Sequence, residues 1–483
     1  MKIFQTKKTL LIIFFYLLTI NSVYAQELPE LGNRGSSILS PHDEQELGKI
    51  FLQEIQREVP IIHDPMINEY INALGKKLVI NSTNPKNHFD FFVVENSSIN
   101  AFTGPNGYIG VNTGLISTTK TESELASVLA HEISHVNQHH LAYTLERAKS
   151  SNISTLAILV AAAVIGAHSN SDIAAAAIPA AIDQKMQGML GFSRENEAEA
   201  DRIGMQNLYK AGFDPAAMPD FFERMQRATL DYGEQIPAYF QNHPLTSDRI
   251  ADVENRSKQY PPKKIASSYN YYLIKARINV LTAPTGYSAV NYFKSQIQNN
   301  TYDDANAANY GYALALIREN KTAEAESIIT SLINKNPDEP AYSMILAHAK
   351  VNAKQYQEAL KILSSSSAKH PNYYPITIQY AQTLLSANQP EEARLLLQKQ
   401  VNNHANDEVL FSLLAQAQGQ SGHLAEAYQT RAKLFEIYGN NKLAVVQLEQ
   451  ALQIPNLDAI TKTNIQAKIN IIKGIPFAPK RSK

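Results

Sequence analysis

Two histidines and a glutamate form the strongest chemical pattern in this sequence. His131 and His135 are four residues apart and Glu132 follows the first of them, in the order HExxH. On a helix, residues four apart lie on one face, about 6 Å apart along the axis, so both imidazoles can reach one metal ion. Zinc accepts two neutral histidine nitrogens and one carboxylate and keeps a fourth position open for water. The pattern therefore indicates a catalytic zinc site.

The glutamate inside the pattern is the candidate base. A bound zinc ion lowers the pKa of a water molecule to about 7, and a carboxylate beside that water can take its proton and pass it to a leaving amine. This chemistry is peptide hydrolysis, with Glu132 as the catalytic base. The alternative is a chance match, because the chain has 13 histidines and helical histidine or glutamate often faces solvent.

A third metal ligand is required, and the acidic segment from 193 to 204 offers several candidates. Glu195, Glu197 and Glu199 all compete for this role. Glu197 and Asp201 are four residues apart, so Glu197 can bind the metal while Asp201, one turn later, holds the second nitrogen of a ligand histidine. The alternative is an acidic helix face in contact with solvent.

Other polar and apolar features near the pattern have plainer interpretations. His139 and His140 follow it directly, and we expect solvated side chains near a helix end rather than ligands. Residues 156–167 and 173–182 are apolar but too short to cross a membrane, so we expect a buried hairpin. The alternative is an apolar lid over the metal site, with peripheral membrane contact through residues 153–190.

Helix caps and apolar spacing predict the elements that position these residues. We expect a helix over 41–58, strands over 88–95 and 108–113, and a capping box of Thr121 and Glu124 that opens the HExxH helix. The segment over 108–113 either binds substrate backbone by edge pairing or belongs to the core of the sheet. A second helix is predicted from apolar residues on one stripe, which are Ile67, Tyr70, Ile71, Leu74 and Leu78.

Residues 308–442 repeat with a period of 34 residues. The alanines in register are Ala313, Ala347, Ala381 and Ala415, with Glu-Ala pairs at 324–325, 358–359, 392–393 and 426–427. Small residues at this spacing allow two antiparallel helices to approach closely, which is typical of the tetratricopeptide repeat. Helices over about 266–300 and 443–475 are expected to be extra or capping units.

The N-terminal sequence and the composition indicate an exported protein. Lysines precede a short apolar run at 9–20, and small residues end at Ala25, where we expect a signal peptidase to cut. The chain has no cysteine, which excludes disulfides and a lipid-modified cysteine. A net charge of −1 over 483 residues gives no indication of a nucleic-acid partner. We expect the periplasm of a Gram-negative cell.

Several segments together resemble the BepA (YfgC) family over nearly the whole chain beyond Ala25. The segments that carry the resemblance are HEISH at 131–135, NEAEADRIG at 196–204, NHPL at 242–245 with Arg249, NAF at 100–102, NTG at 112–114 and the repeats. The resemblance implies a periplasmic zinc metallopeptidase with a tetratricopeptide arm, related to HtpX and the CAAX prenyl proteases and associated with outer-membrane β-barrel assembly. In that family ExxxD supplies the third ligand, which carries over to Glu197 with Asp201.

The resemblance also implies roles for His243 and Arg249. In related enzymes a His-Pro segment with a downstream arginine lies near the metal, which maps to these two residues. His243 either donates to the developing oxyanion or occupies the open fourth position of zinc as a cap, and the cap is favoured because an exported protease among unfolded proteins needs restraint. Arg249, like Asp201, is expected to support the ligands from outside.

We therefore expect an α+β zincin-like metallopeptidase domain followed by an all-α tetratricopeptide-repeat solenoid. The predicted parts are a signal peptide at 1–25, the peptidase at 26–265 and the repeats at 266–483. The expected function is endoproteolysis with one zinc ion per subunit, acting on unfolded or stalled outer-membrane proteins. The alternative is mainly a chaperone or assembly scaffold, in which the repeats dock on the barrel-assembly machinery and proteolysis is restrained. A purely structural zinc is disfavoured, because two histidines and one glutamate leave a position open.

Overall fold

The computed structural model describes most of the chain. The described residues are 40–147, 153–166, 192–232, 237–262 and 264–474. The signal peptide predicted at 1–25 and the apolar segment at 173–182 lie outside the described residues.

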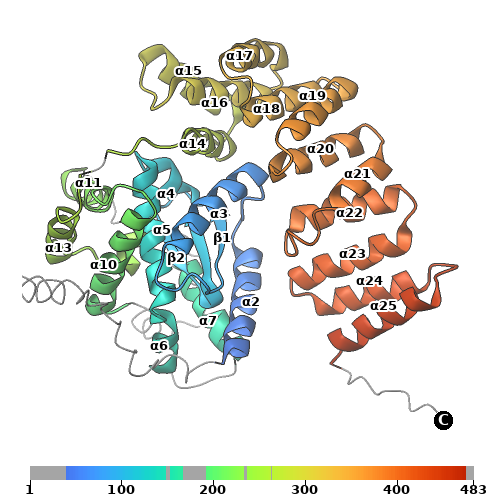
Figure 1. Ribbon diagram of the computed structural model, residues 1–483, viewed down its shortest axis with the longest axis horizontal. Helices are drawn as coiled ribbons and strands as arrows, with labels where there is room; N and C mark the ends of the chain where they lie inside the picture. The colour runs from blue at the N-terminus through green and yellow to red at the C-terminus, as the bar shows by residue number, and fades with distance from the viewer. Residues whose placement is uncertain (1–39, 148–152, 167–191, 233–236, 263, 475–483) are drawn as a thin grey trace, which may run out of the picture. The chain divides into compact units, whose positions relative to one another are not determined.

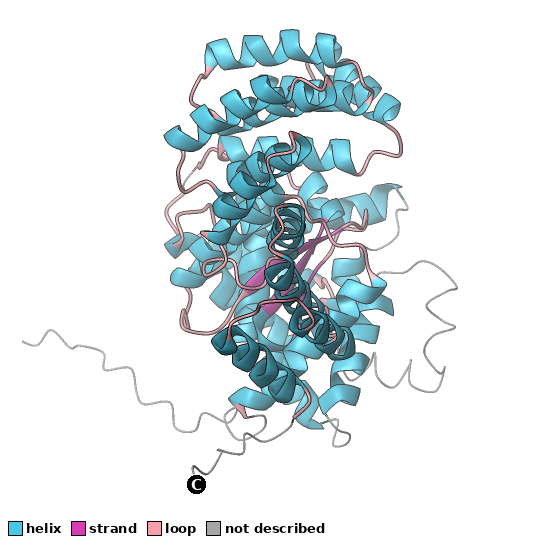
Figure 2. Cartoon of the chain, turned by 90° about the vertical axis from the view of Figure 1, so that its right-hand side faces the viewer, coloured by secondary structure: helices cyan, strands magenta, loops and turns pink. Residues whose placement is uncertain are grey.

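A small three-stranded sheet lies beside the helix that carries the HExxH pattern, and Figure 2 shows its strands among helices. Strand β1 (Asp90–Val94) pairs in parallel with β3 (Tyr108–Asn112), and β2 (Ala101–Thr103) pairs with β3 in antiparallel fashion. The order is β1-β3-β2. The strands predicted at 88–95 and 108–113 are confirmed, whereas β2 was not predicted. Because β3 is the central strand, the edge-pairing role for 108–113 is wrong and the core role is confirmed.

Two N-terminal helices pack around this sheet. Helix α2 (Pro41–Glu58) has the predicted bounds, and α3 (Pro65–Ile80) buries the predicted apolar stripe. Asp64 caps α3, because its carboxylate accepts hydrogen bonds from two amide N–H groups of the first turn. Gly75 lets α3 lie close to β1, since a Cβ at this position would meet the ring of Phe91 at 2.4 Å.

The HExxH helix is α5 (Glu122–Asn137), and Thr121 caps it by accepting from the N–H of Glu124 at 3.2 Å. The second half of the predicted capping box is wrong. The Glu124 carboxylate accepts from the N–H of Lys120 and pairs with Arg224, whose charge draws it away from Thr121. The surrounding helices are α4 (Thr113–Thr118), α6 (His140–Arg147), α10 (Arg194–Lys210), α11 (Ala217–Tyr232), α12 (Ala238–Asn242) and α13 (Ser247–Ser257).

The first arm of the predicted apolar hairpin is helix α7 (Ile153–Gly166), which packs against α2. Ala157, Val160 and Ala161 are buried, whereas the side chain of Ile158 is 46% exposed. Within the described part of the chain, no helix combines the length and the apolar character needed to cross a membrane.

The C-terminal half is built from helices in antiparallel pairs, coloured yellow to red in Figure 1. They are α14 (Tyr269–Leu281), α15 (Gly286–Asn299), α16 (Ala305–Arg318), α17 (Thr322–Lys335), α18 (Pro340–Asn352), α19 (Tyr356–Lys369), α20 (Tyr374–Ser386), α21 (Pro390–Gln398), α22 (Glu408–Gln420), α23 (Leu424–Ile437), α24 (Asn441–Leu452) and α25 (Ala459–Ile472). The alanines predicted from the 34-residue period are all buried. The predicted fold class, an α+β domain followed by an all-α solenoid, is confirmed.

Helix α14 joins the repeats to the peptidase core. It packs against α3 and α4, and the fully buried Tyr271 donates its hydroxyl hydrogen to the carbonyl of Thr119 at 2.6 Å. Arg277 donates two hydrogen bonds to the Oδ2 atom of Asp64, at 2.8 and 2.6 Å. The hydrophobic core therefore runs across the boundary predicted at residues 265–266.

Candidate metal centre

Helix α5 carries three chemical groups into the protein interior. His131, Glu132 and His135 are 1%, 0% and 1% exposed. A buried imidazole or carboxylate is costly unless it has a partner, so these side chains must be held by other groups. The partners come from α10, from the segment after α12 and from strand β2.

Helix α10 approaches α5 closely where the first histidine lies. Gly204 faces the α5 backbone, and a Cβ there would lie 3.1 Å from the amide nitrogen of His131. Ser193 begins the helix by accepting from the N–H of Asn196. The carboxylate of Glu197 then lies 3.6 Å from Nε2 of His131 and 3.4 Å from Nε2 of His135.

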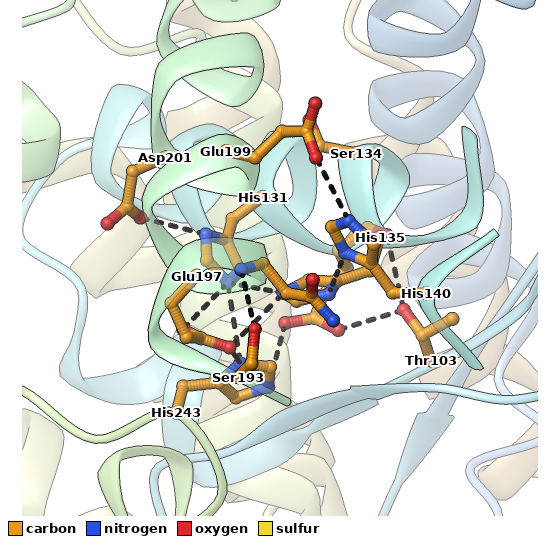
Figure 3. A network of polar contacts seen from close by, with 12 residues as sticks. Thr103, His131, Ser134, His135, His140, Ser193, Glu197, Glu199, Asp201 and His243 are labelled. Carbon is orange, nitrogen blue, oxygen red and sulfur yellow. Dashed lines mark hydrogen bonds and ion pairs between the residues drawn. The ribbon is translucent and has the colours of Figure 1, made fainter. Parts of the chain in front are cut away.

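Four side chains converge at one point, as Figure 3 shows. One nitrogen or oxygen from each of His131, His135, Glu197 and His243 lies within 4.8 Å of the others. The Nε2 atoms of His131 and His135 are 2.9 Å apart. Three imidazole nitrogens and one carboxylate oxygen are a donor set that zinc accepts. The residues present therefore fit a divalent metal such as zinc.

The competing acidic residues of α10 lie elsewhere. Glu195 is exposed to solvent on the first turn of the helix. Glu199 lies with its Oε2 atom 3.4 Å from Nε2 of His140, outside the group of four donors. Glu197 is thus the α10 carboxylate that reaches both histidines of the HExxH pattern.

Asp201 and Arg249 support the first histidine from outside. The Oδ1 atom of Asp201 lies 2.9 Å from Nδ1 of His131. Arg249 donates to both carboxylate oxygens of Asp201, at 2.5 and 2.9 Å, and to the carbonyl of His243 at 3.0 Å. Since the ionised aspartate only accepts, Nδ1 of His131 is the donor in this contact, and Nε2 is the ring nitrogen that faces the centre.

His243 lies among the donors rather than in a solvated loop. It follows α12, its N–H donates to the carbonyl of Tyr239, and its ring stacks on that tyrosine at 4.7 Å. Its Nδ1 lies 2.9 Å from Oε1 of Glu197, and its Nε2 lies 3.5 Å from Oε1 of Glu132. One imidazole thus contacts both carboxylates of the site.

Glu132 is oriented by strand β2. The hydroxyl of Thr103 donates to Oε2 of Glu132 at 2.8 Å, while Oε1 has no hydrogen-bond partner among the described residues. Burial raises the pKa of Glu132. A carboxylate with one fixed oxygen and one oxygen without a hydrogen bond is suited to accept a proton.

Burial and charge also set the protonation of the other groups. Burial lowers the pKa of His135 well below its ordinary value, so the ring is neutral, as a metal ligand must be. Burial opposes ionisation of Glu197, but the charge of His243 and hydrogen bonds from the histidines hold its pKa well below the usual range. Burial likewise opposes ionisation of Asp201, and Arg249 outweighs it and lowers that pKa.

The sequence interpretation missed two residues at this centre. His140 was expected to be solvated, yet it is 3% exposed and its Nδ1 lies 2.9 Å from Nδ1 of His135, because the chain turns back at His139. Thr103 was missed because the three-residue strand that carries it is too short to show an alternating pattern. The position of Thr103, a polar residue directly after the NAF segment at 100–102, was the feature of the sequence that could have indicated its role.

The sequence is similar to those of known proteins. Residues 65–257 match peptidase family M48, and residues 351–417 match a tetratricopeptide repeat. A Vibrio cholerae protein with the name beta-barrel assembly-enhancing protease is 34% identical over 445 residues, which are 92% of each chain. The Escherichia coli beta-barrel assembly-enhancing protease is 34% identical over 353 residues, which are 70% of each chain. The chain therefore belongs to the family of beta-barrel assembly-enhancing proteases, M48 metallopeptidases with tetratricopeptide repeats.

Proposed function

We propose that this protein is a periplasmic zinc endopeptidase that degrades misfolded or stalled outer-membrane β-barrel proteins. The observation that carries the proposal is the convergence of His131, His135 and Glu197 beside the buried Glu132. The names of the relatives, which link them to β-barrel assembly, support the substrate class.

The proposed metal is one zinc ion per chain, held by His131, His135 and Glu197. Each of the three offers one donor atom, and these atoms lie within 4.8 Å of one another. Bound zinc supplies Lewis-acid polarisation of the substrate carbonyl and lowers the pKa of the attacking water. Asp201 and Arg249 are proposed to fix the orientation of His131 through the hydrogen bonds described above.

Glu132 is proposed to move the proton. Its Oε1 atom accepts the proton of the attacking water and later donates it to the leaving amine. Thr103 holds Oε2, which leaves Oε1 without a hydrogen bond, 3.5 Å from Nε2 of His243. Because the carboxylate is fully buried, bulk water does not compete for its proton.

His243 is proposed as a cap on the fourth position of the metal. Its contacts with Glu197 and Glu132 support this role. The second candidate role is donation to the developing oxyanion. His243→Ala should raise self-cleavage if the residue is a cap, and should lower activity by about 10² to 10³ if it is an oxyanion donor. An unchanged rate of self-cleavage and of substrate cleavage would reject both roles.

We propose a separate role for each part of the chain. Residues 1–25 are a signal peptide for export, residues 26–265 form the peptidase, and residues 266–483 dock on the outer-membrane barrel-assembly machinery. Stacked helical repeats offer an extended surface for such a partner. We further propose peripheral membrane contact through 153–190, of which helix α7 exposes Ile158.

The second candidate function is a chaperone or assembly scaffold with restrained proteolysis. The position of the His243 imidazole between two carboxylates of the site favours this candidate. The two functions can be distinguished in cells with Glu132→Gln. A scaffold should keep its cellular function in this variant, whereas a protease should lose it. Both can operate in one protein.

The direct test is a trapping experiment with Glu132→Gln, which should keep the metal and the fold. Pull-down from the periplasm should retain intact outer-membrane proteins that the wild type cleaves. Glu195→Gln is the matched control, because this exposed glutamate lies on α10 two residues before Glu197. If Glu132→Gln cleaves an unfolded barrel protein as fast as the control, Glu132 is not the base.

A further inference from the structure

His140 lies directly behind His135. Its side chain is buried, and its Nδ1 atom lies 2.9 Å from Nδ1 of His135. The other ring nitrogen of His135, Nε2, faces His131 and Glu197. His140 therefore contacts His135 through the ring nitrogen that does not face His131 and Glu197, and Figure 3 draws both histidines within the network of polar contacts.

A left-handed residue brings His140 to this position. Helix α5 ends at Asn137, and His139 has a φ of 55° before α6 begins at His140. The carbonyl of His139 accepts from the N–H of Tyr143, so the turn leads directly into the next helix. This conformation is uncommon for residues with a Cβ, although histidine is among those enriched in it.

The contact between the two rings has a defined polarity if His135 binds a metal. The metal takes the lone pair of Nε2, so the proton of His135 must be on Nδ1. That N–H donates to His140, whose Nδ1 must then be the acceptor. The proton of His140 is consequently on its Nε2, which lies 3.4 Å from the carboxylate oxygen Oε2 of Glu199. In this series of hydrogen bonds, the N–H of His135 donates to His140 and the N–H of His140 donates to Glu199.

The two histidines of the HExxH pattern are thus supported in parallel ways by one helix. Asp201 accepts directly from Nδ1 of His131, whereas Glu199 reaches His135 through His140. Asp201 is buried and paired with Arg249, but the side chain of Glu199 is 43% exposed. The support of His135 therefore depends mainly on His140, which is buried, and less on the partly exposed Glu199.

We propose that His140 is a positioning residue that fixes the tautomer and ring orientation of His135 for metal binding. The inference rests on the proposed function, because it assumes that His135 is a ligand. His140 is not itself a ligand, since it lies outside the group of donors that converge among the described residues. A residue that only fills space would tolerate an apolar side chain of similar size.

The test compares His140→Leu, which removes the acceptor, with His140→Asn, whose Oδ1 replaces Nδ1. The dissociation constant for zinc is measured on the full chain by competition with a chelator, and melting is measured on the metal-free proteins. His140→Leu should weaken zinc binding by about 10- to 100-fold, the usual range for loss of a hydrogen-bond partner behind a ligand. His140→Asn should retain most of the wild-type affinity.

The outcomes separate this inference from the proposed function. Unchanged zinc affinity in His140→Leu would overturn the positioning role and leave the proposed function intact. Equal loss in both variants, with equal melting temperatures of the metal-free proteins, would show that the acceptor is irrelevant and would also overturn it. Wild-type protein that binds no zinc would overturn the proposed function and this inference together.

Discussion

The metal site and the repeat helices use their buried side chains in opposite ways. Around α5 and α10 the interior holds imidazoles and carboxylates, and their contacts join positions 70 and 112 residues apart in the sequence. In the repeats the buried side chains are mostly apolar, with alanines at the positions of the 34-residue period, and each helix contacts its neighbours in the series. The metal site is therefore a connected network, whereas the repeats are a series of local interfaces.

This difference predicts whether a substitution affects only its own surroundings or also the properties of distant residues. Groups in one hydrogen-bond network respond together, so one substitution should alter metal binding, activity and stability at once. In a solenoid each unit contacts mainly its neighbours, so a substitution should change stability near its own position. The predictions below test this contrast from the largest expected effect to the smallest.

The largest effect is expected for Glu132→Gln. Loss of the proton carrier should lower kcat by about 10² to 10⁴, the usual contribution of a general base. Zinc content should stay near one per chain, because Glu132 is not among the converging donors. The measurement is peptide cleavage together with metal analysis. Loss of the zinc along with the activity would show that Glu132 holds the metal instead.

A large combined effect is expected for Asp201→Ala. The change removes one of the two carboxylate partners of the buried Arg249 and leaves only Glu197, which should cost about 3 kcal/mol in the free energy of unfolding. It also releases His131, so zinc affinity should fall by about 10- to 100-fold. Denaturant unfolding and chelator competition measure the two effects. If Asp201→Ala and Arg249→Ala add without coupling, the two residues do not form one network.

A smaller and purely local effect is expected for Ala347→Leu in the repeats. The alanine is fully buried on α18, so the larger side chain should overpack the interface and cost about 1 to 3 kcal/mol. Zinc affinity should not change. Ala368→Leu is the matched control, because this alanine is exposed on α19. Altered zinc binding in Ala347→Leu would contradict the local character of the repeats.

The smallest effect is expected for Lys258→Ala. Lys258 pairs with Glu254 at 2.7 Å, but the two side chains are 65% and 55% exposed. Exposed pairs contribute little, so the free energy of unfolding should change by no more than about 0.5 kcal/mol. A loss as large as that of Asp201→Ala would mean that the presence of a charge pair, rather than its burial, determines stability.

The repeats could be predicted from the sequence because their determinants are local and periodic. A 34-residue period indicated every helix pair from α16 to α23, and the alanine columns indicated the buried positions. The contact of α14 with the peptidase was not visible in this way. It depends on Tyr271 and Arg277, whose partners lie far earlier in the chain.

The metal site was only partly accessible to the same reasoning. HExxH spacing on a helix identifies His131 and His135, because both lie on one face. Glu197 was favoured over Glu195 and Glu199 by its spacing to Asp201 and by the family pattern, whereas the contact of Glu199 with His140 depends on how α10 packs against α5 and could not be predicted from spacing. His140 was misjudged because its position depends on the backbone conformation of one residue, His139, and no sequence pattern reports a positive φ at a histidine.

The most direct test of the central claim is a crystal structure of the zinc-loaded protein with anomalous data at the zinc edge. The account predicts one strong peak per chain, about 2.0 to 2.2 Å from Nε2 of His131, Nε2 of His135 and a carboxylate oxygen of Glu197. A peak held by other residues, or no peak in protein that cleaves substrate, would contradict it.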